Sequence, residues 1–153
     1  MSVVNIIEPE RVDTKVDANS KKRALEYISE LISKNDPSMN PIDVFDSLLA
    51  REKLGSTGVG QGVAIPHGRM KSCQKPVGAF IRLSQAIDFD AIDNKPVDLL
   101  FALLVPEEST NEHLEILSSL AEMFKDSDFR EKLHEVDTST DVFKLLSEWE
   151  SVH

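Results

Sequence analysis

The sequence predicts a single compact α/β domain, in which α-helices flank a central β-sheet. Three observations support this fold class. Helical apolar spacing occupies residues 20–53, strand-like apolar segments occupy residues 63–105, and helical spacing returns from residue 109. No repeat, low-complexity segment or Pro/Gly/Ser-rich linker divides the 153-residue chain, so we expect one domain over residues 1–153. The order of the strands does not follow from the sequence.

The first two helices have clear N-terminal caps. Ser20 is expected to cap a helix that fades near Asn35 and Pro37. Asn40 is expected to cap the second helix, with Pro41 as its first residue, where a missing N–H costs nothing. The apolar residues expected on the inner faces of these helices are Ala24, Leu25, Ile28, Leu31 and Ile32, followed by Ile42, Phe45, Leu48 and Leu49.

The middle of the chain changes from helical to strand-like patterns. Gly55 should end the second helix in a left-handed conformation and open an irregular, glycine-rich loop. A short strand is expected at residues 63–65, stopping at Pro66. Further strands are expected at residues 77–83 and 97–105. The last is a near-continuous apolar run, which is typical of a strand covered on both faces.

The last part of the chain is helical. Ser109 and Glu112 form a Ser-x-x-Glu capping box that should open a helix. Two more helices are expected at residues 128–134 and 139–149. The apolar residues expected on the inner faces are Leu114, Leu117, Leu120, Ala121 and Phe124 in the first of these helices, and Val142, Leu145, Leu146 and Trp149 in the last.

The composition excludes several classes of function. The chain has 17 Lys+Arg against 27 Asp+Glu, a net charge of −10, which argues against binding to nucleic acid or to anionic lipid. The longest apolar run, residues 99–106, is far shorter than the roughly 20 residues that span a bilayer. One cysteine allows no internal disulfide, and the N-terminus shows no secretory signal. We therefore expect a cytoplasmic protein without membrane insertion.

The segment from Arg51 to residue 69, REKLGSTGVGQGVAIPHGR, carries the chemistry. It combines one histidine, His67, with a glycine-rich loop, the hydroxyls of Ser56 and Thr57, and an arginine. Exposed backbone N–H groups, hydroxyls and a guanidinium would suit a phosphate or another anion beside an imidazole. Ser56 and Thr57 are therefore candidate phosphate-binding residues. The alternative is that His67 is a loop histidine with a structural hydrogen bond, and that the glycines serve a tight connection.

Other chemistries find little support. The segment lacks the Gly-x-x-x-x-Gly-Lys-Ser/Thr pattern of a P-loop and the Gly-x-Gly-x-x-Gly pattern of dinucleotide-binding folds, so no nucleotide cofactor is expected. The chain has no Gly-x-Ser-x-Gly motif of a serine hydrolase. Cys73 stands alone between Lys71 and Lys75, whose charges favour a thiolate, but it is expected to be incidental.

The remaining histidines offer one further candidate. His113 is either a partly exposed first-turn residue or a second imidazole that faces the site near the positive end of its helix. His134, in a charged helix, and His153, at the C-terminus, are expected to have no role. A metal site made from His67 and His113 lacks an evident third ligand, so no metal is expected.

Residues 55–69, GSTGVGQGVAIPHGR, closely resemble the phosphorylation-site signature of enzyme IIA proteins of the bacterial phosphoenolpyruvate phosphotransferase system. The resemblance is to the fructose/mannitol class and, within it, to the nitrogen-regulatory enzyme IIA. Residues 20–32 and 91–106 are also similar to that subgroup, and the resemblance extends over nearly the whole chain.

This resemblance implies a mixed sheet flanked by helices, no cofactor, and a small histidine phosphocarrier protein, of the nitrogen type, as phosphoryl donor. It implies that His67 is the phosphorylated nucleophile and that Arg51 and His113 belong to the active site. We expect Nε2 of His67 to attack phosphorus. In that mechanism Arg51, the Ser56 hydroxyl and loop N–H groups stabilise the transferring phosphoryl group, while His113 donates a hydrogen bond to it.

Three functions compete. The first is a regulatory phosphocarrier, a phosphotransferase component that controls partner proteins by its phosphorylation state; the resemblance points to partners in potassium transport or to sensor kinases. The second is a transport enzyme IIA that passes phosphate to a IIB domain. The third is an interaction module that has lost phosphotransfer, which the presence of Arg51, His67 and His113 argues against. The similarity at residues 91–106 favours the first.

Overall fold

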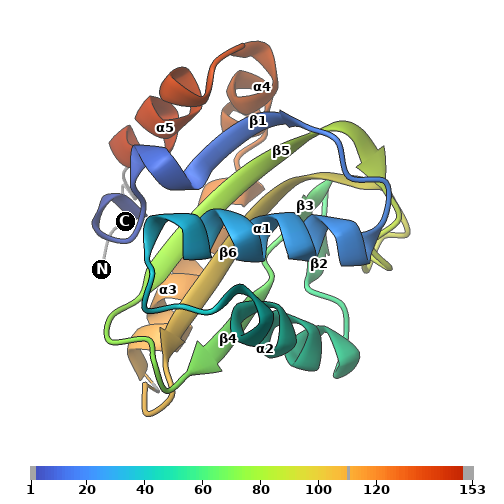
Figure 1. Ribbon diagram of the computed structural model, residues 1–153. Helices are drawn as coiled ribbons and strands as arrows, with labels where there is room; N and C mark the ends of the chain where they lie inside the picture. Colours follow the sequence, from blue (N-terminus) through green and yellow to red (C-terminus); the bar gives the residue numbers. More distant parts are fainter. Residues whose placement is uncertain (1–2, 110, 150–153) are drawn as a thin grey trace.

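The computed structural model describes residues 3–109 and 111–149 and confirms an α/β fold with one mixed sheet (Figure 1). The strands are β1 (Val12–Val16), β2 (Gly58–Gly60), β3 (Val63–Ala64), β4 (His67–Met70), β5 (Val77–Ile87) and β6 (Val97–Pro106). The helices are α1 (Lys21–Asn35), α2 (Pro41–Lys53), α3 (Asn111–Lys125), α4 (Ser127–Glu135) and α5 (Ser139–Glu148), preceded by the 3₁₀ turns η1 (Val3–Asn5) and η2 (Pro9–Arg11).

Strand β6 is the centre of the sheet. Along one side it pairs antiparallel with β5, and β1 lies parallel to β5 at the edge. Along the other side it pairs parallel first with β3 and then with β4, while β2 closes this edge antiparallel to β3. The main strand order is β1-β5-β6-β3-β2. The near-continuous apolar pattern of β6 follows from this position, because nearly all of its residues are buried.

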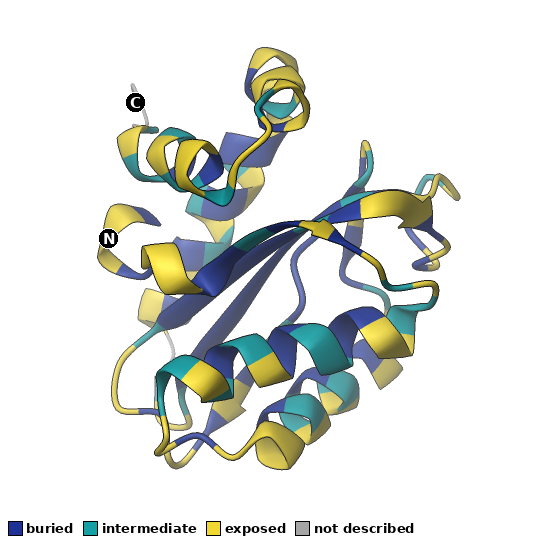
Figure 2. Cartoon of the chain, turned by 45° about the horizontal axis from the view of Figure 1, so that its top comes forward, coloured by how far each residue is buried: buried dark blue, intermediate teal, exposed yellow. Residues whose placement is uncertain are grey.

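Two layers of helices cover the two faces of the sheet. Side chains alternate along β6: Leu100, Ala102 and Leu104 join the core under α1 and α2, whereas Leu99, Phe101, Leu103 and Val105 join the core under α3, α4 and α5. This two-residue period is what a strand imposes on its side chains. Figure 2 shows buried residues along the sheet and on the inner faces of the helices, with exposed residues on their outer faces.

The helix boundaries largely confirm the sequence prediction. The Ser20 hydroxyl accepts a hydrogen bond from the Arg23 N–H at 3.1 Å, and the Asn40 side chain accepts one from the Ile42 N–H at 2.8 Å. Gly55 follows α2 with a φ of +153°, a conformation that a side chain would strain. The capping box predicted before α3 includes residue 110 and so lies outside the described residues.

Two predicted helix faces are wrong in part. Ile42, Leu114 and Ala121 were expected to face the core but are exposed, Ile42 by 68% and Leu114 by 63%. Leu48 in α2 and Leu120 and Phe124 in α3 are buried, as predicted. The other buried side chains, which were not predicted on the inner faces, are Val44 and Glu52 in α2 and His113, Ile116 and Met123 in α3. Apolar residues occupy more than one side of each helix, so their spacing alone could not decide which side faces the sheet.

Three short strands were not predicted. β1 precedes the first helix, β2 lies inside the glycine-rich loop that was expected to be irregular, and β4 begins at His67 itself. β1 and β4 are held by partners far along the chain, β1 by β5 and β4 by β6, whereas β2 pairs with the neighbouring β3. His67 is therefore not a loop residue: it opens a strand and pairs with Leu103 of β6.

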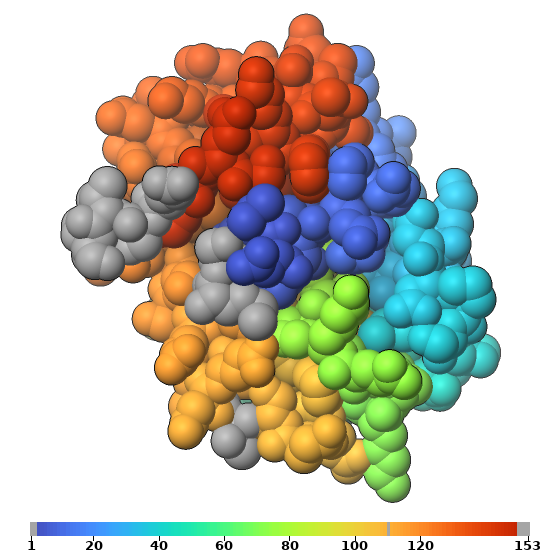
Figure 3. Space-filling view, turned by 90° about the vertical axis from the view of Figure 1, so that its left-hand side faces the viewer, coloured from blue at the N-terminus to red at the C-terminus, as the bar shows by residue number. Residues whose placement is uncertain are grey.

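The N-terminal segment is tied to the body of the domain. The buried Arg11 donates hydrogen bonds to the carbonyls of Gly78, at 2.8 Å, and Ile6, at 3.1 Å. In Figure 3 this segment, in dark blue, lies between the C-terminal helical region in red and the start of β5 in green. In the described part of the chain, no helix has the length and apolar character needed to cross a membrane.

Candidate functional site

Three elements bring charged and titratable side chains together around His67. Arg51 comes from the last turn of α2, His67 and Arg69 from β4, and His113 from the first turn of α3. All four line one open hollow of about 430 Å³. The complete lining consists of Ser47, Ala50, Arg51, Leu54, His67, Gly68, Arg69 and His113. The structure therefore brings together the three residues predicted as catalytic.

A glycine allows α2 to reach this site. A Cβ added to Gly68 would overlap the Ser47 hydroxyl and lie 3.1 Å from the Ser47 carbonyl carbon. The Ser47 hydroxyl in turn donates a hydrogen bond to the Arg69 carbonyl at 3.1 Å. Helix α2 thus packs against the backbone of β4, which places Arg51 beside the histidine.

The surroundings of His67 set its tautomer. Its Nδ1 lies 2.8 Å from the Ile65 carbonyl oxygen, which can only accept, so Nδ1 carries the proton and Nε2 carries the lone pair. Burial lowers the pKa of His67, and the charges of Arg51 and Arg69 lower it further, while the Ile65 carbonyl acts in the opposite direction. A pKa below the ordinary 6.5 leaves His67 neutral and nucleophilic at pH 7.

His113 has the complementary arrangement. Its ring centroid is 5.3 Å from that of His67, with an angle of 59° between the rings. The residue is only 6% exposed, and its Nδ1 is buried without a hydrogen-bond partner among the described residues. A buried N–H without an acceptor is rarer than an unused acceptor, so the proton belongs on Nε2. Burial lowers the pKa of His113, followed by the neighbouring His67 and Arg69, so this ring is also neutral.

Two arginines supply positive charge to the hollow. The Arg51 guanidinium donates a hydrogen bond from Nη1 to the Gly55 carbonyl at 2.8 Å. Arg69 is two residues after His67 on β4, so both side chains lie on the same face of the strand. Sequence analysis did not place Arg69 in the site. The two-residue spacing of His67 and Arg69 is visible in the sequence, but it predicts a shared face only if this segment is a strand.

Ser56 and Thr57 do not lie in this hollow. The Ser56 hydroxyl donates to the Phe89 carbonyl at 2.7 Å and accepts from the Gly58 N–H at 3.0 Å. The buried Thr57 gives both its N–H and its hydroxyl to the Glu52 carboxylate. Their predicted role in phosphate binding does not fit this geometry, because both hydroxyls are engaged with the protein and neither residue lines the hollow.

The other candidates are not brought to the site. Burial raises the pKa of the Cys73 thiol to about 11, and its Sγ donates to the Lys75 carbonyl, so the predicted influence of the neighbouring lysines does not produce a thiolate. His134 pairs with Asp98 at 3.0 Å, and His153 lies outside the described residues. Across residues 3–109 and 111–149, no three His, Cys, Asp or Glu side chains cluster as metal ligands would.

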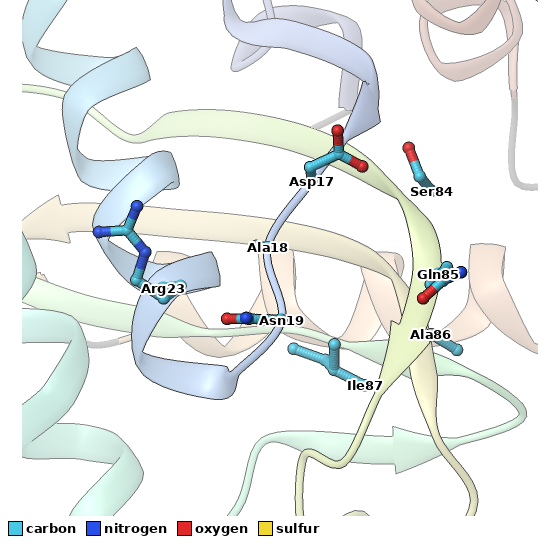
Figure 4. Close-up of a pocket in the computed structure, with 8 residues that line it drawn as sticks. All are labelled: Asp17, Ala18, Asn19, Arg23, Ser84, Gln85, Ala86 and Ile87. Atoms are coloured by element: carbon cyan, nitrogen blue, oxygen red, sulfur yellow. The ribbon is translucent and has the colours of Figure 1, made fainter.

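A second hollow is larger but chemically different. It has a volume of about 550 Å³ and lies where residues 17–19 leave β1 and β5 continues (Figure 4). Asp17, Ala18, Asn19, Arg23, Ser84, Gln85, Ala86 and Ile87 line it. Its ionisable groups, Asp17 and Arg23, are both exposed, and it contains no histidine. Its one hydroxyl, that of Ser84, has no histidine in the lining to activate it.

Comparison with known proteins gives consistent matches. Residues 5–149 match the family described as phosphoenolpyruvate-dependent sugar phosphotransferase system, EIIA 2. A nitrogen regulatory protein of Pseudomonas aeruginosa is 45% identical over 141 residues, 92% of each chain. The crystal structure of nitrogen regulatory protein IIA-Ntr from Neisseria meningitidis has a TM-score of 0.88 and 46% identity, covering 94% of this chain and 98% of that one. A protein of Haloferax volcanii described as a fructose-specific EIIA component is 40% identical over 129 residues, 84% of each chain.

Proposed function

This chain belongs to the EIIA 2 family of the phosphoenolpyruvate-dependent sugar phosphotransferase system, and we propose that within it His67 accepts a phosphoryl group from the phosphohistidine of a small carrier protein. The observation that carries the proposal is the histidine pair. His67 presents an Nε2 lone pair, and His113, with its ring centroid 5.3 Å away, presents an Nε2–H donor. One ring is prepared to attack phosphorus and the other to hold a phosphoryl oxygen.

The transfer is an in-line displacement at phosphorus. The P–N bond of the donor phosphohistidine breaks as the bond from phosphorus to His67 Nε2 forms, and the donor nitrogen recovers its lone pair. The His67 ring then carries positive charge, because Nδ1 keeps its proton. The Ile65 carbonyl, 2.8 Å from Nδ1, stabilises that charge. Both states are phosphohistidines, so the reaction is close to balanced and reversible.

Catalysis consists of positioning and charge stabilisation, because the transition state is loose and spreads negative charge over three equatorial oxygens. Arg51 and Arg69 provide positive charge on the wall of the hollow, and His113 provides a neutral donor. The rings remain neutral beside two guanidinium groups, so neither histidine loses its role to protonation at pH 7. No metal or nucleotide is needed in this scheme.

We further propose that the protein acts as a regulator whose phosphorylated and free forms bind different partners in the cytoplasm. The similarity to nitrogen regulatory proteins supports this assignment. Leu54 lines the hollow and is 85% exposed. A phosphoryl group on His67 changes this partly apolar surface into a dianionic one, which alters binding without a change of fold. Components of potassium transport and sensor kinases are the partners to test first.

A second candidate function is transfer of the phosphoryl group to a sugar-transport IIB domain. The likeness to the fructose-specific EIIA component favours it, and the chemistry at His67 would be the same in both roles. Acceptance of phosphate by a IIB domain would support this alternative.

The test is intact mass after incubation with phosphoenolpyruvate and a donor pair, either the sugar-type or the nitrogen-type enzyme I and carrier. We expect a gain of one acid-labile phosphoryl group, faster with the nitrogen-type pair and absent in His67→Ala. Faster labelling by the sugar-type pair would support the transport function. Labelling of His67→Ala would remove His67 from the mechanism, and no labelling from either pair would overturn the proposal.

A further inference from the structure

The residue after Arg51 has an unusual environment. The Glu52 side chain is only 2% exposed, and its carboxylate receives three donors. Lys21 Nζ lies 2.8 Å from Oε2, the Thr57 N–H donates to Oε1 at 3.1 Å, and the Thr57 hydroxyl also donates to Oε1. A buried carboxylate must be paired and hydrogen-bonded in this way. A buried ion pair adds little net stability compared with apolar packing, so stability alone is a weak reason for it.

The partners of this carboxylate fix the loop that follows α2. Lys21, from the first turn of α1, also lies over the Phe89 ring at 4.7 Å. The Phe89 carbonyl in turn accepts a hydrogen bond from the Ser56 hydroxyl at 2.7 Å. Residues 56 and 57 are thus held from two directions. Directly before them is Gly55, whose carbonyl accepts a hydrogen bond from the Arg51 guanidinium at 2.8 Å.

We propose that Glu52 is a positioning residue for phosphotransfer, which holds the loop at residues 54–57 so that the Gly55 carbonyl can orient the Arg51 guanidinium toward His67. The proposal rests on the proposed function for its consequence in catalysis, but its structural part stands separately. Glu52 does not line the hollow, so its carboxylate does not contact the phosphoryl group there. Its negative charge favours a higher pKa of His67, and its contacts with the loop reach the hollow through Arg51. This arrangement also explains why Thr57 is buried on a carboxylate and does not face a phosphate.

A double-mutant cycle on the rate of phosphoryl transfer tests the coupling. Glu52→Gln keeps an acceptor for Thr57 but loses the charge opposite Lys21. We expect it to reduce kcat about tenfold, with KM for the phosphorylated carrier nearly unchanged, because the loss is one of orientation. In an Arg51→Ala background the same substitution should have no further effect. Equal fold losses in both backgrounds would overturn the proposal.

Two further variants separate positioning from folding. Lys21→Met/Glu52→Gln removes both charges, so that no half-buried ammonium is left with only the exposed Asp90 carboxylate, 3.7 Å away, as its partner. It should keep the reduced kcat of Glu52→Gln while regaining part of its stability. Asp126→Ala, which removes the N-cap of α4, serves as a matched destabilised control and should transfer at the wild-type rate. If Asp126→Ala slows transfer as much as Glu52→Gln at similar stability, the effect is one of folding and the positioning role is wrong.

A second readout does not need phosphotransfer. Arginine ¹⁵N NMR, with the Arg51 signal assigned from Arg51→Lys, should show restricted guanidinium rotation in the wild type and averaged signals in Glu52→Gln. Unchanged Arg51 signals would overturn the proposal. If the wild-type protein accepts no phosphoryl group, the proposed function fails, while this measurement still decides whether Glu52 orients Arg51.

Discussion

Two of the hollows of this domain differ in a way that volume does not reveal. The larger, about 550 Å³, is left open where β1 ends its pairing with β5 and the chain turns away toward α1 (Figure 4). The smaller, about 430 Å³, is built where α2, β4 and α3 meet. Only the smaller one brings two histidines with lowered pKa values and two arginines to one place. Converging chemistry, and not size, marks the site.

Packing explains this difference. In the smaller hollow the absence of a side chain at Gly68 lets a helix contact a strand, and the helix carries Arg51 with it. In the larger hollow the lining side chains Ser84, Gln85 and Ala86 are exposed. They belong to the C-terminal part of β5, beyond Leu83, where its pairing with β1 ends. Substitutions with matched chemistry in the two hollows should therefore have very different effects.

The largest effect should come from replacing Arg51 in the smaller hollow, with the same replacement of Arg23 in the larger hollow as the control. In the proposed mechanism Arg51→Met removes a charge-assisted donor from the transferring phosphoryl group, so we expect the transfer rate to fall about 100-fold, as for loss of one donor to a developing charge. Arg23→Met, in the larger hollow, should leave the rate unchanged. Single-turnover transfer from the phosphorylated carrier measures both. A comparable loss in Arg23→Met would show that the larger hollow takes part in transfer.

Extra side-chain volume at Gly68 should give the next largest effect, with added volume at Ala86 in the larger hollow as the comparison. In Gly68→Ala the new Cβ would overlap Ser47. Relieving this overlap requires α2 to move away from β4. We expect a loss of about 2 kcal/mol in the free energy of unfolding and a decrease in transfer of about 30-fold. Ala86→Val adds bulk at an exposed position of the larger hollow and should change neither quantity. Urea denaturation and transfer kinetics provide the test, and wild-type behaviour of Gly68→Ala would contradict the packing account.

Features set by local interactions could be predicted from the sequence. The caps at Ser20 and Asn40 use side chains within three residues of the backbone groups that they bind, and β6 shows its burial in its own composition. The candidate residues Arg51, His67 and His113 came from a contiguous motif and from the family resemblance. The structure places all three around one hollow.

Features set by distant partners could not be predicted. β4 has only four residues and exists because it pairs with β6, so the shared face of His67 and Arg69 was not visible in the sequence. Which side of α3 is buried depends on the sheet beneath it, so Leu114 was expected inside and is exposed. The path of Ser56 depends on the Phe89 carbonyl, 33 residues away, which no local pattern indicates.

The role of Arg69 can be tested through the histidines beside it. Its charge lowers the pKa of both His67 and His113, so Arg69→Met should raise both pKa values and slow transfer at pH 7.5 about fivefold by removing positive charge near the phosphoryl group. Arg69→Lys keeps the charge and should restore most of the rate. NMR titration of the histidine rings gives the pKa values. Unchanged titration in Arg69→Met would place this guanidinium away from both rings.

The smallest effect should be that of pH between 8 and 6.5, and its sign follows from the direction of the pKa shifts. A pKa of His67 below 6.5 means that less than half of the rings are protonated at pH 6.5, so the transfer rate should fall less than about twofold over this range and more steeply below it. Stability should follow the same direction. The histidines of the unfolded chain bind protons more readily than His67 and His113 do in the folded state, so the free energy of unfolding decreases as pH falls through 6.5.

The control for the pH dependence of the rate is Arg69→Met, whose transfer rate should begin to decline at a higher pH. The ratio of the wild-type rate to the Arg69→Met rate removes any pH dependence of the donor. A wild-type rate that already halves above pH 6.5, or a ratio that does not change with pH, would contradict the neutral histidine pair from which the mechanism is built.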